Sequence, residues 1–524
     1  MASKRLSKDP NGATDSGSSQ ERSWGQPLAL GIALVAGVAI LQRFVGLGRS
    51  FAVCRWLSSE ELGRWDLSFA FLMSTAPLVV LGIPGSFGRF AEDYRVAGKS
   101  SQFILSTALA CLASLLVSIL CTVIFYGPIS QFWLNSAPDL TWITTIIPAL
   151  VLTVLFNYLS SLASGLRLHK IYARVQAIHG IVFAVACLVL LPLMAFKASS
   201  VVNSYAAACG LGAAILAYEI RREFRQKGYS VRPMETDSFI RETRESLVQI
   251  LPFAISICVA TFITNAFSMG GRLLLLHWSE SEATGLLLVG YYHTARIIPR
   301  LMTQFAGTIS GMATPHFVKD FNEQGPSALS NRLSTLLKAM SLGFTAAGSA
   351  VLLAAPTLFA WVLEERSDVA IAWLPWVLAS SITLSMSLVM QNVFWCTNRS
   401  WQVSITYAAG LATNFAFAVL LEPRFGPLAI LISTFASTLL ILWLQILLAA
   451  RLGCSIDSKT LILLLLPGIL LSSAATATIF LASVFAAVVL HRAFVTTSEY
   501  ERLEILLHSS LSRMQPSNWL RVRP

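Results

Sequence analysis

Charged residues are scarce in this chain. Asp, Glu, Lys and Arg make up 12% of the 524 residues, and 55% are hydrophobic; soluble proteins have roughly 25% charged residues. Apolar runs of about 20 residues recur, too long for a soluble core and long enough to cross a bilayer. The composition therefore excludes a soluble protein and predicts an all-α, polytopic membrane protein. The net charge of +11 fits an excess of Lys and Arg in cytoplasmic loops, so we expect no nucleic-acid partner.

Signatures of enzymes and metal sites are also missing. The eight cysteines have no CxxC spacing and mostly lie inside apolar runs, which predicts packing residues, not disulfides or metal ligands. There is no glycine loop of the Walker type, so the chain does not hydrolyse ATP itself. No outer loop is long enough for a catalytic domain, which argues against a polymerase, ligase or glycosyltransferase. We expect no enzymatic activity, no cofactor and no metal.

Apolar segments fall in two groups of six around a polar stretch, residues 219–246, that is rich in charge of both signs. We interpret this stretch as a cytoplasmic linker between an N-terminal lobe (27–218) and a C-terminal lobe (247–449). Residues 1–26 are predicted to be a disordered cytoplasmic tail. The predicted spans are residues 27–53, 63–84, 102–126, 140–162, 174–195, 199–218, 247–276, 284–312, 333–363, 369–396, 401–421 and 425–449.

Lys and Arg alternate between the loops. They follow every second span, for example Arg95 and Lys99 after the second and Arg399 after the tenth, whereas loops 127–139 and 277–283 contain neither. By the positive-inside rule, the N-terminus and the linker face the cytoplasm.

The segment 450–491 adds one or two crossings. Its apolar part, residues 461–490, fits one long span or a short hairpin broken near Ser472–Ala475. The tail 492–524 is basic and should be cytoplasmic, which requires an even number of crossings. The pattern therefore favours the hairpin, giving a total of 14 spans against 13 for a single span.

Polar side chains cluster in the middle of the eighth predicted span. His293, Arg296, Arg300 and Gln304 follow one another at spacings of three and four residues, so they form one stripe on a helix. Charges near mid-bilayer are expensive and need a partner or a hydrated cavity. Pro299 lies within the stripe, removes a backbone hydrogen bond and predicts a kink.

The first and seventh predicted spans add Gln42 with Arg43, and Asn265 with Arg272. We predict that Arg43, together with the two arginines of the stripe, faces a water-filled cavity. Arg272 lies near the outer end of its span and fits either the cavity or snorkelling to the interface.

For other polar residues of the spans, a purely structural role remains an alternative to a role in the cavity. His293 alone would more often be a packing histidine, and only its place on the stripe favours the cavity. Arg49 is predicted to be an interfacial anchor. Gln391 and Asn392 fit interhelical hydrogen bonds as well as ligand contacts.

Carboxylates are nearly absent from the spans. Asp66, Glu92 and Asp93 are predicted to lie near span ends, so the cavity should carry net positive charge. Guanidinium groups bind phosphate oxygens in bidentate fashion, which predicts an anionic amphiphile such as a phosphate-headed lipid. A cation exporter would need carboxylates in its spans.

Four stretches carry a family likeness: QRFVGLGRSFAVCRWLSSEELGRWDLSFAF, LGIPGSFGRFAEDYRVAGK, VGYYHTARIIPRLMTQFAGTISGMATPHF and NRSWQVSITYAAGLATNFAFAVLLEPRFGPLAILIS. They keep their order over nearly the whole chain. Together they resemble the bacterial oligosaccharide flippases, which move O-antigen or polysaccharide units, within the multidrug/oligosaccharidyl-lipid/polysaccharide exporter superfamily.

The resemblance implies two six-helix lobes around a central cavity that opens alternately to either side of the bacterial inner membrane. It also implies a cargo of oligosaccharide linked through pyrophosphate to a polyprenyl lipid. Arg43, Arg296 and Arg300 match basic cavity positions of the family. Gly271–Arg272 stands where many relatives have an Asp-Arg pair, so a carboxylate that could join a charge switch is missing from that span.

We therefore interpret the chain as a flippase for a lipid-linked saccharide. The alternatives are a transporter of the same fold for drugs or a peptidoglycan precursor, and a polysaccharide polymerase. Expected partners are the lipid-linked saccharide, membrane lipids, a polysaccharide polymerase and glycosyltransferases. The predicted substrate-binding residues are Arg43, Arg296, Arg300, Arg272, His293, Gln42, Gln304 and Asn265.

Overall fold

The computed structural model describes residues 42–97, 99–166, 168–226, 236–363 and 367–491, and this part of the chain is helical with no strand. Each of the twelve predicted spans overlaps a helix; the first is described from residue 42 and runs to 56. The predicted tails 1–26 and 492–524 lie outside the described residues. The remaining helices are α2 (Ser59–Val79), α3 (Ile83–Val96), α4 (Ser100–Ile124), α5 (Tyr126–Leu134), α6 (Leu140–Gly165), α7 (His169–Leu193), α8 (Ala198–Gln226), α9 (Thr236–His277), α10 (Glu282–Gln324), α11 (Pro326–Leu363), α12 (Ser367–Cys396), α13 (Trp401–Phe425), α14 (Leu428–Arg451), α15 (Ser458–Leu463), the 3₁₀ helix η3 (Leu466–Leu471) and α16 (Ala474–His491).

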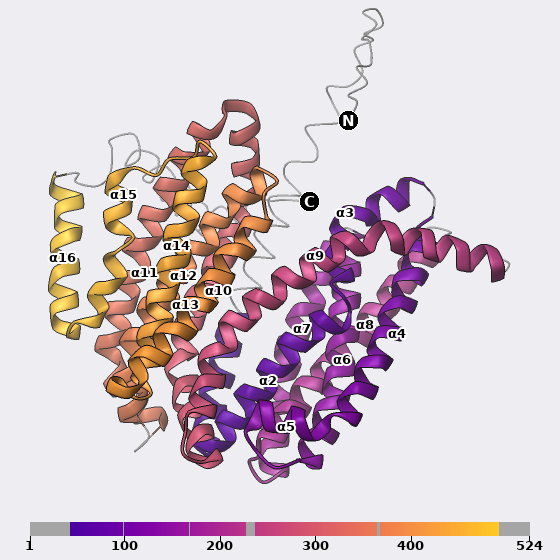
Figure 1. The fold of residues 1–524 in the computed structure, drawn as a ribbon, viewed down its shortest axis with the longest axis horizontal. Coiled ribbons are helices and arrows are strands. Elements are labelled where there is room, and N and C mark those ends of the chain that lie inside the picture. Colours follow the sequence, from indigo (N-terminus) through magenta and orange to yellow (C-terminus); the bar gives the residue numbers. More distant parts are fainter. Residues whose placement is uncertain (1–41, 98, 167, 227–235, 364–366, 492–524) are drawn as a thin grey trace, which may run out of the picture.

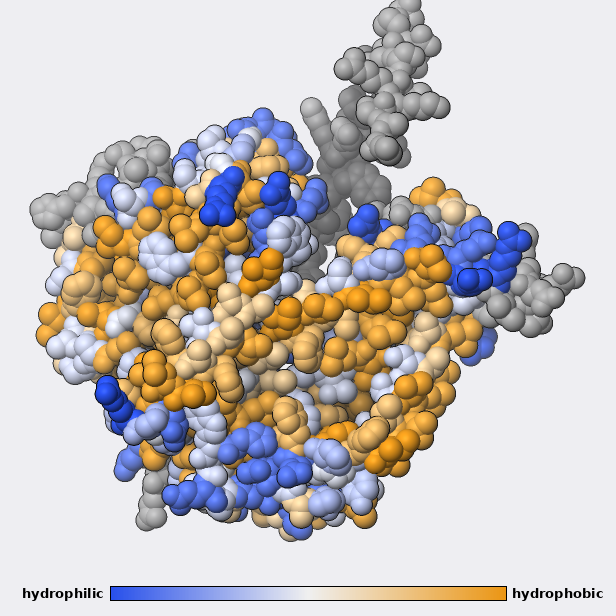
Figure 2. Space-filling view, viewed as in Figure 1, coloured by the Kyte–Doolittle hydropathy of each residue, from blue (hydrophilic) through white to orange (hydrophobic). Residues whose placement is uncertain are grey.

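The chain is a multi-pass membrane protein. Within the described ranges, nine helices are long and apolar enough to cross a bilayer, and α2 with α3 would form a tenth span bent by 51°. On the face seen in Figure 2, hydrophobic residues form a broad band across the middle, and hydrophilic residues gather toward the two ends. The long helix α10 is not among the nine, which agrees with the polar stripe in its middle turns.

The helices form two lobes (Figure 1). In the N-terminal lobe, α6 packs against α2, α3, α7 and α8; in the C-terminal lobe, α12 packs against α10, α11 and α14, and α13 against α14. The helix α9 contacts both lobes, because it packs on α2, α3 and α4 as well as on α10, α13 and α14. The predicted linker lies here: its described residues continue α8 and begin α9, and residues 227–235 lie outside the described part.

Two local features differ from the predicted spans. The second span breaks after Val79, where Leu81 and Gly82 have positive φ of 50° and 68° and α3 turns away. A side chain at Gly82 would also overlap the carbonyl oxygen of Ala254 in α9, so glycine is required there. The predicted outer loop 127–139 contains the short helix α5, which starts at Tyr126.

The predicted hairpin at the C-terminal end is present. α15 and η3 run one way, the chain breaks at Ser472, and α16 returns beside them against α11 (Figure 1). Its first turn is held by Lys338 of α11, which is 4% exposed and whose Nζ lies 3.1 Å from Asp457 Oδ2. Burial alone would raise the pKa of the Asp457 carboxyl, but hydrogen bonds from Thr460 and Lys338 lower it below its ordinary value.

The lobes touch where α2 crosses α10. A methyl group at Gly63 would overlap the carbonyl oxygen of Leu286, and one at Gly290 would overlap that of Ser59. The two contacts are reciprocal: residue pairs 227 positions apart, such as Gly63 and Gly290, take equivalent places. The crossing therefore has local two-fold symmetry.

A surface ion-pair cluster lies at the same end of α2 and α10. The guanidinium of Arg64 lies 3.2 Å from Asp139, at the start of α6, and 3.2 Å from Glu282, at the start of α10. Arg64 thus joins the two lobes beside the glycine crossing.

Replacing glycine by alanine should change stability in opposite directions inside and outside the crossing. Gly63→Ala or Gly290→Ala should lower the stability of the detergent-purified protein by about 1–3 kcal/mol, because the new methyl group meets backbone that cannot yield. Gly307→Ala, in α10 with no atom within 4 Å of its Cβ position, should instead gain up to about 1 kcal/mol from helix propensity. Thermal unfolding measures both effects. A gain at all three positions would show that the helices do not touch as described.

Candidate functional site

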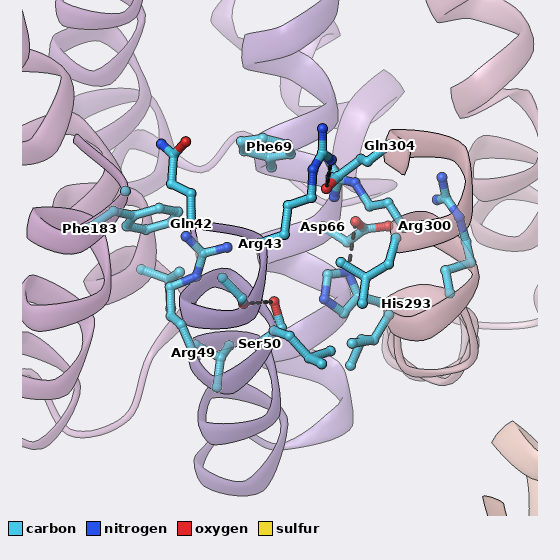
Figure 3. A pocket seen from close by; sticks show the side chains of 18 of the residues that line it. Gln42, Arg43, Arg49, Ser50, Asp66, Phe69, Phe183, His293, Arg300 and Gln304 are labelled. Atoms are coloured by element: carbon cyan, nitrogen blue, oxygen red, sulfur yellow. Dashed lines mark hydrogen bonds and ion pairs between the residues drawn. The ribbon is translucent and has the colours of Figure 1, made fainter. Parts of the chain in front are cut away.

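A cavity of about 360 Å³ lies between the lobes (Figure 3). Its wall comes from helix 42–56, α2, α7 and α8 on one side and from α10 on the other. Helix 42–56 lies between α7 and α10: Gln42 donates a hydrogen bond to the carbonyl of Gln176, and Arg43 bonds to α10.

Among the described residues, four guanidinium groups line this cavity, and each lies over an aromatic ring. Arg49 Cζ is 3.9 Å from the ring centre of Phe183, the shortest of the four distances. The stripe prediction for α10 is confirmed in geometry, because Arg296 and Arg300 both face the cavity. The other pairs are Arg43 with Phe305 at 5.3 Å, Arg296 with Tyr292 at 5.0 Å and Arg300 with Phe69 at 5.4 Å.

The ring contacts hold the cations without neutralising them. A ring face attracts a guanidinium through its quadrupole and leaves the N–H edges free to bind an anion. Within the described part of the chain, no carboxylate lies within ion-pair distance of Arg49, Arg296 or Arg300. The cavity is therefore strongly cationic.

Arg43 has polar partners in the opposite lobe. Its Nη1 donates to Gln304 Oε1 at 2.8 Å and its Nη2 donates to Thr308 Oγ1 at 2.5 Å. Both acceptors lie on α10, so this cavity arginine also ties helix 42–56 to the C-terminal lobe.

Asp66 corrects the expectation that no carboxylate lies at depth in the spans. It is 2% exposed and lines the cavity from α2. Its Oδ1 is hydrogen-bonded to His293 Nδ1 at 2.8 Å, and its Oδ2 lies 3.1 Å from Arg272 Nε in an ion pair. The carboxylate missing beside Arg272 in the seventh span is thus supplied by the second span.

Six predicted substrate residues meet in the cavity and two do not. Arg272 is 6% exposed and sits behind the cavity wall on Asp66, so it does not snorkel. Asn265 donates to the carbonyl of Met73 at 3.0 Å and also lies outside the lining. The six that line the cavity are Gln42, Arg43, His293, Arg296, Arg300 and Gln304.

Sequence reasoning missed two charged residues of the cavity, Arg49 and Asp66. Arg49, predicted to be an interfacial anchor, lines the cavity, so that prediction was wrong. Asp66 was placed near a span end because the span was predicted to begin at residue 63. α2 begins at Ser59, which places Asp66 about 10 Å along the helix.

The polar pair of the tenth span is structural. Gln391 donates to Tyr407 at 3.1 Å, and Asn392 bonds to Ser310 at 2.8 Å and to Thr314 at 2.6 Å. These side chains lie outside the cavity lining, which confirms the alternative of interhelical hydrogen bonds.

Solved transporters share this fold. The lipid II flippase MurJ in an inward closed conformation is similar with a TM-score of 0.61 and 11% identity, covering 87% of this chain and 100% of that one. A multidrug resistance MATE family transporter of the MOP superfamily, inward-facing, gives 0.60 and 13%, covering 79% and 95%. The eukaryotic MATE transporter AtDTX14 gives 0.54 and 14%, covering 86% and 98%. At these identities the likeness establishes the fold alone.

Sequence comparison identifies the family of the chain. No curated protein matches it, but the family model described as polysaccharide biosynthesis protein matches residues 28–320, more than half of the chain. The matched region covers the first eight predicted spans. It therefore includes the polar stripe from His293 to Gln304 that lines the cavity. The chain belongs to the polysaccharide biosynthesis protein family.

Proposed function

We propose that this chain is a flippase that moves a polyprenyl-pyrophosphate-linked oligosaccharide across the membrane through the cationic cavity. The observation that carries the proposal is a set of three cavity arginines, Arg49, Arg296 and Arg300, each beside a ring face and with no carboxylate of the described residues within ion-pair distance.

The cost of these charges supports an anionic cargo. An arginine at the centre of a spanning helix costs about 2.5–3.5 kcal/mol on insertion scales, so three would cost roughly 8–10 kcal/mol. Carboxylate partners would reduce that cost but would also occupy the N–H edges. Leaving the edges free is useful only if an anion binds them, and a pyrophosphate offers oxygens for bidentate contacts.

The amphiphilic nature of the cargo follows from where the cavity lies. It lies between two lobes, and the face of the molecule seen in Figure 2 is apolar over its middle, so we infer that a charged head group would bind inside while a prenyl tail stays in the lipid. Phe69 and Phe183 also line the cavity and add apolar surface beside the cations.

Orientation and mechanism complete the proposal. The resemblance to bacterial oligosaccharide flippases supports a place in the bacterial cytoplasmic membrane, and the positive-inside rule supports an N-terminus on the inside. The glycine crossing and Arg64 then lie at the outer end, near the loops without Lys or Arg, and the state described here is closed to the outside. Rocking of the lobes about the 219–246 linker would open that end. We propose no enzymatic activity; a polymerase and glycosyltransferases remain predicted partners.

The sign of the cavity potential can be measured with charged thiol reagents. In a cysteine-free background, Ser50→Cys places a thiol in the cavity and Ser472→Cys places one in the exposed hairpin bend. The rate ratio of a sulfonate reagent to a trimethylammonium reagent should be roughly tenfold higher at position 50, because the arginines concentrate anions. Arg296→Ala/Arg300→Ala should reduce this difference. Equal ratios at both positions would rule out a cationic cavity.

The proposed transport can be tested in vesicles containing a fluorescent polyprenyl-pyrophosphate saccharide. Wild type should flip the lipid, and Arg296→Ala/Arg300→Ala should lower the rate by a factor of 10² or more, since about 1.4 kcal/mol per lost charge contact is tenfold. The matched control is Lys319→Ala/Arg399→Ala, which removes two exposed charges outside the cavity and should flip like wild type.

The outcomes separate site from cargo. If the folded cavity variant flips as fast as wild type, these arginines are structural and the site assignment is wrong. If folded wild type leaves this lipid in place, the saccharide cargo is wrong. Lipid II, the cargo named for MurJ, and a drug are then the next substrates to test.

A further inference from the structure

Asp66 is the one carboxylate among the described residues that line the cavity, and it sits on the symmetric crossing of the lobes. It lies one helical turn beyond Gly63, as its partner His293 lies one turn beyond Gly290, and the two residues are 227 positions apart. The Asp66–His293 hydrogen bond therefore lies near the two-fold axis of the crossing.

All the groups that face Asp66 from the C-terminal lobe are cationic or basic. Arg272 comes from α9 and His293 from α10, and the charges of Arg296 and Arg300 on α10 also act on the carboxylate. From its own lobe, the Cys54 thiol lies nearby on helix 42–56. Asp66 thus supplies the negative side of a buried contact between the lobes.

We propose that Asp66 is a latch that holds the crossing shut when the cavity is empty, and that a phosphate of the cargo releases it by taking its place beside the cations of the C-terminal lobe. The identity of the cargo rests on the proposed function; the latch itself rests on the contacts of Asp66.

The energetic argument starts from the empty cavity. Opening the crossing moves α2 away from α9 and α10, so Asp66 loses both partners and Arg272 loses its only ion-pair partner among the described residues. Breaking one side of a buried ion pair is strongly unfavourable because a charge is left without compensation. An empty transporter therefore stays closed at this end.

A bound phosphate changes that balance. Held by Arg296 and Arg300, it lies in the same cavity as Asp66, repels the carboxylate and competes for His293. When the lobes separate, the phosphate stays bound to the C-terminal lobe. The cations of that lobe therefore still have a counter-ion after opening. The anion binds the open state better than the closed one, which is the condition for a ligand to shift an equilibrium.

The experiment measures lobe separation directly. Spin labels at Ala137→Cys and Glu280→Cys, in a cysteine-free full chain in liposomes, report the distance across the end of the molecule that Arg64 bridges. Asp66→Asn keeps the side-chain shape and removes the charge. We expect it to raise the ratio of separated to closed molecules roughly tenfold without any ligand, within the usual range of coupling between sites. Asp66→Glu should restore the closed state.

The matched control is Asp139→Asn. It removes a carboxylate from the same end, but from a partly exposed ion pair with Arg64, so it should change the ratio less than about threefold. A folding defect would appear as loss of the monodisperse peak in both Asp66 variants, whereas a broken latch appears in Asp66→Asn alone.

Inorganic pyrophosphate is the probe for release. It should increase separation in wild type, have little further effect on Asp66→Asn, and have none on Arg296→Ala/Arg300→Ala. If Asp66→Asn stays closed like wild type, there is no latch. If wild type ignores pyrophosphate while Asp66→Asn is open, Asp66 closes the crossing but anion exchange does not release it, and the proposal fails in that part.

The latch and the cargo can fail separately. If the protein opens on pyrophosphate but does not flip the saccharide lipid, the latch is supported and the cargo assignment is wrong. If the protein flips the lipid but Asp66→Asn does not change the separation of the lobes, the cargo assignment is supported and the latch is wrong.

Discussion

The contact between α2 and α10 is the constraint on which the rest of the site depends. Their backbones approach so closely at Gly63 and Gly290 that no Cβ fits at either position. The crossing fixes the rotation of both helices, because the side chains one turn further on must then face each other or the cavity. Asp66 and His293 are placed by this geometry, and so are Phe69 and the guanidinium of Arg300 that lies over it.

The buried cations of the cavity are stabilised in an uncommon way. Buried cations are usually paired with carboxylates, but among the described residues the guanidiniums of Arg49, Arg296 and Arg300 lie over rings and have no carboxylate within ion-pair distance. A ring restrains the position of a guanidinium and contributes about 0.5–2 kcal/mol, less than a carboxylate partner. Arg49, Arg296 and Arg300 are thereby held in place while their N–H groups stay available to an anion. Among the described residues Asp66 is the one carboxylate that lines the cavity, and it takes part in the contact between the lobes.

Much of this could be predicted from the sequence, and the failures have a common cause. Hydropathy placed the spans, and the stripe from His293 to Gln304 was found because its members share one helix at helical spacing. Asp66 and Arg49 were misjudged because each was assessed by its depth along its own span. Their partners, Arg272 and Phe183, come from helices more than 130 residues away, and no local pattern encodes that meeting. The break after Val79 was likewise set by the approach of Ala254.

The symmetry of the crossing explains why its chemistry must be asymmetric. Near a two-fold axis, equivalent residues face each other, so identical charges at Asp66 and His293 would repel and open the lobes. One turn further along, α2 carries Phe69 where α10 carries Arg296, its counterpart 227 positions on. The N-terminal lobe thus presents a carboxylate and a ring at the places where the C-terminal lobe presents an imidazole and a guanidinium. At Asp66 and His293 the two halves of this repeated backbone contact therefore carry complementary side chains.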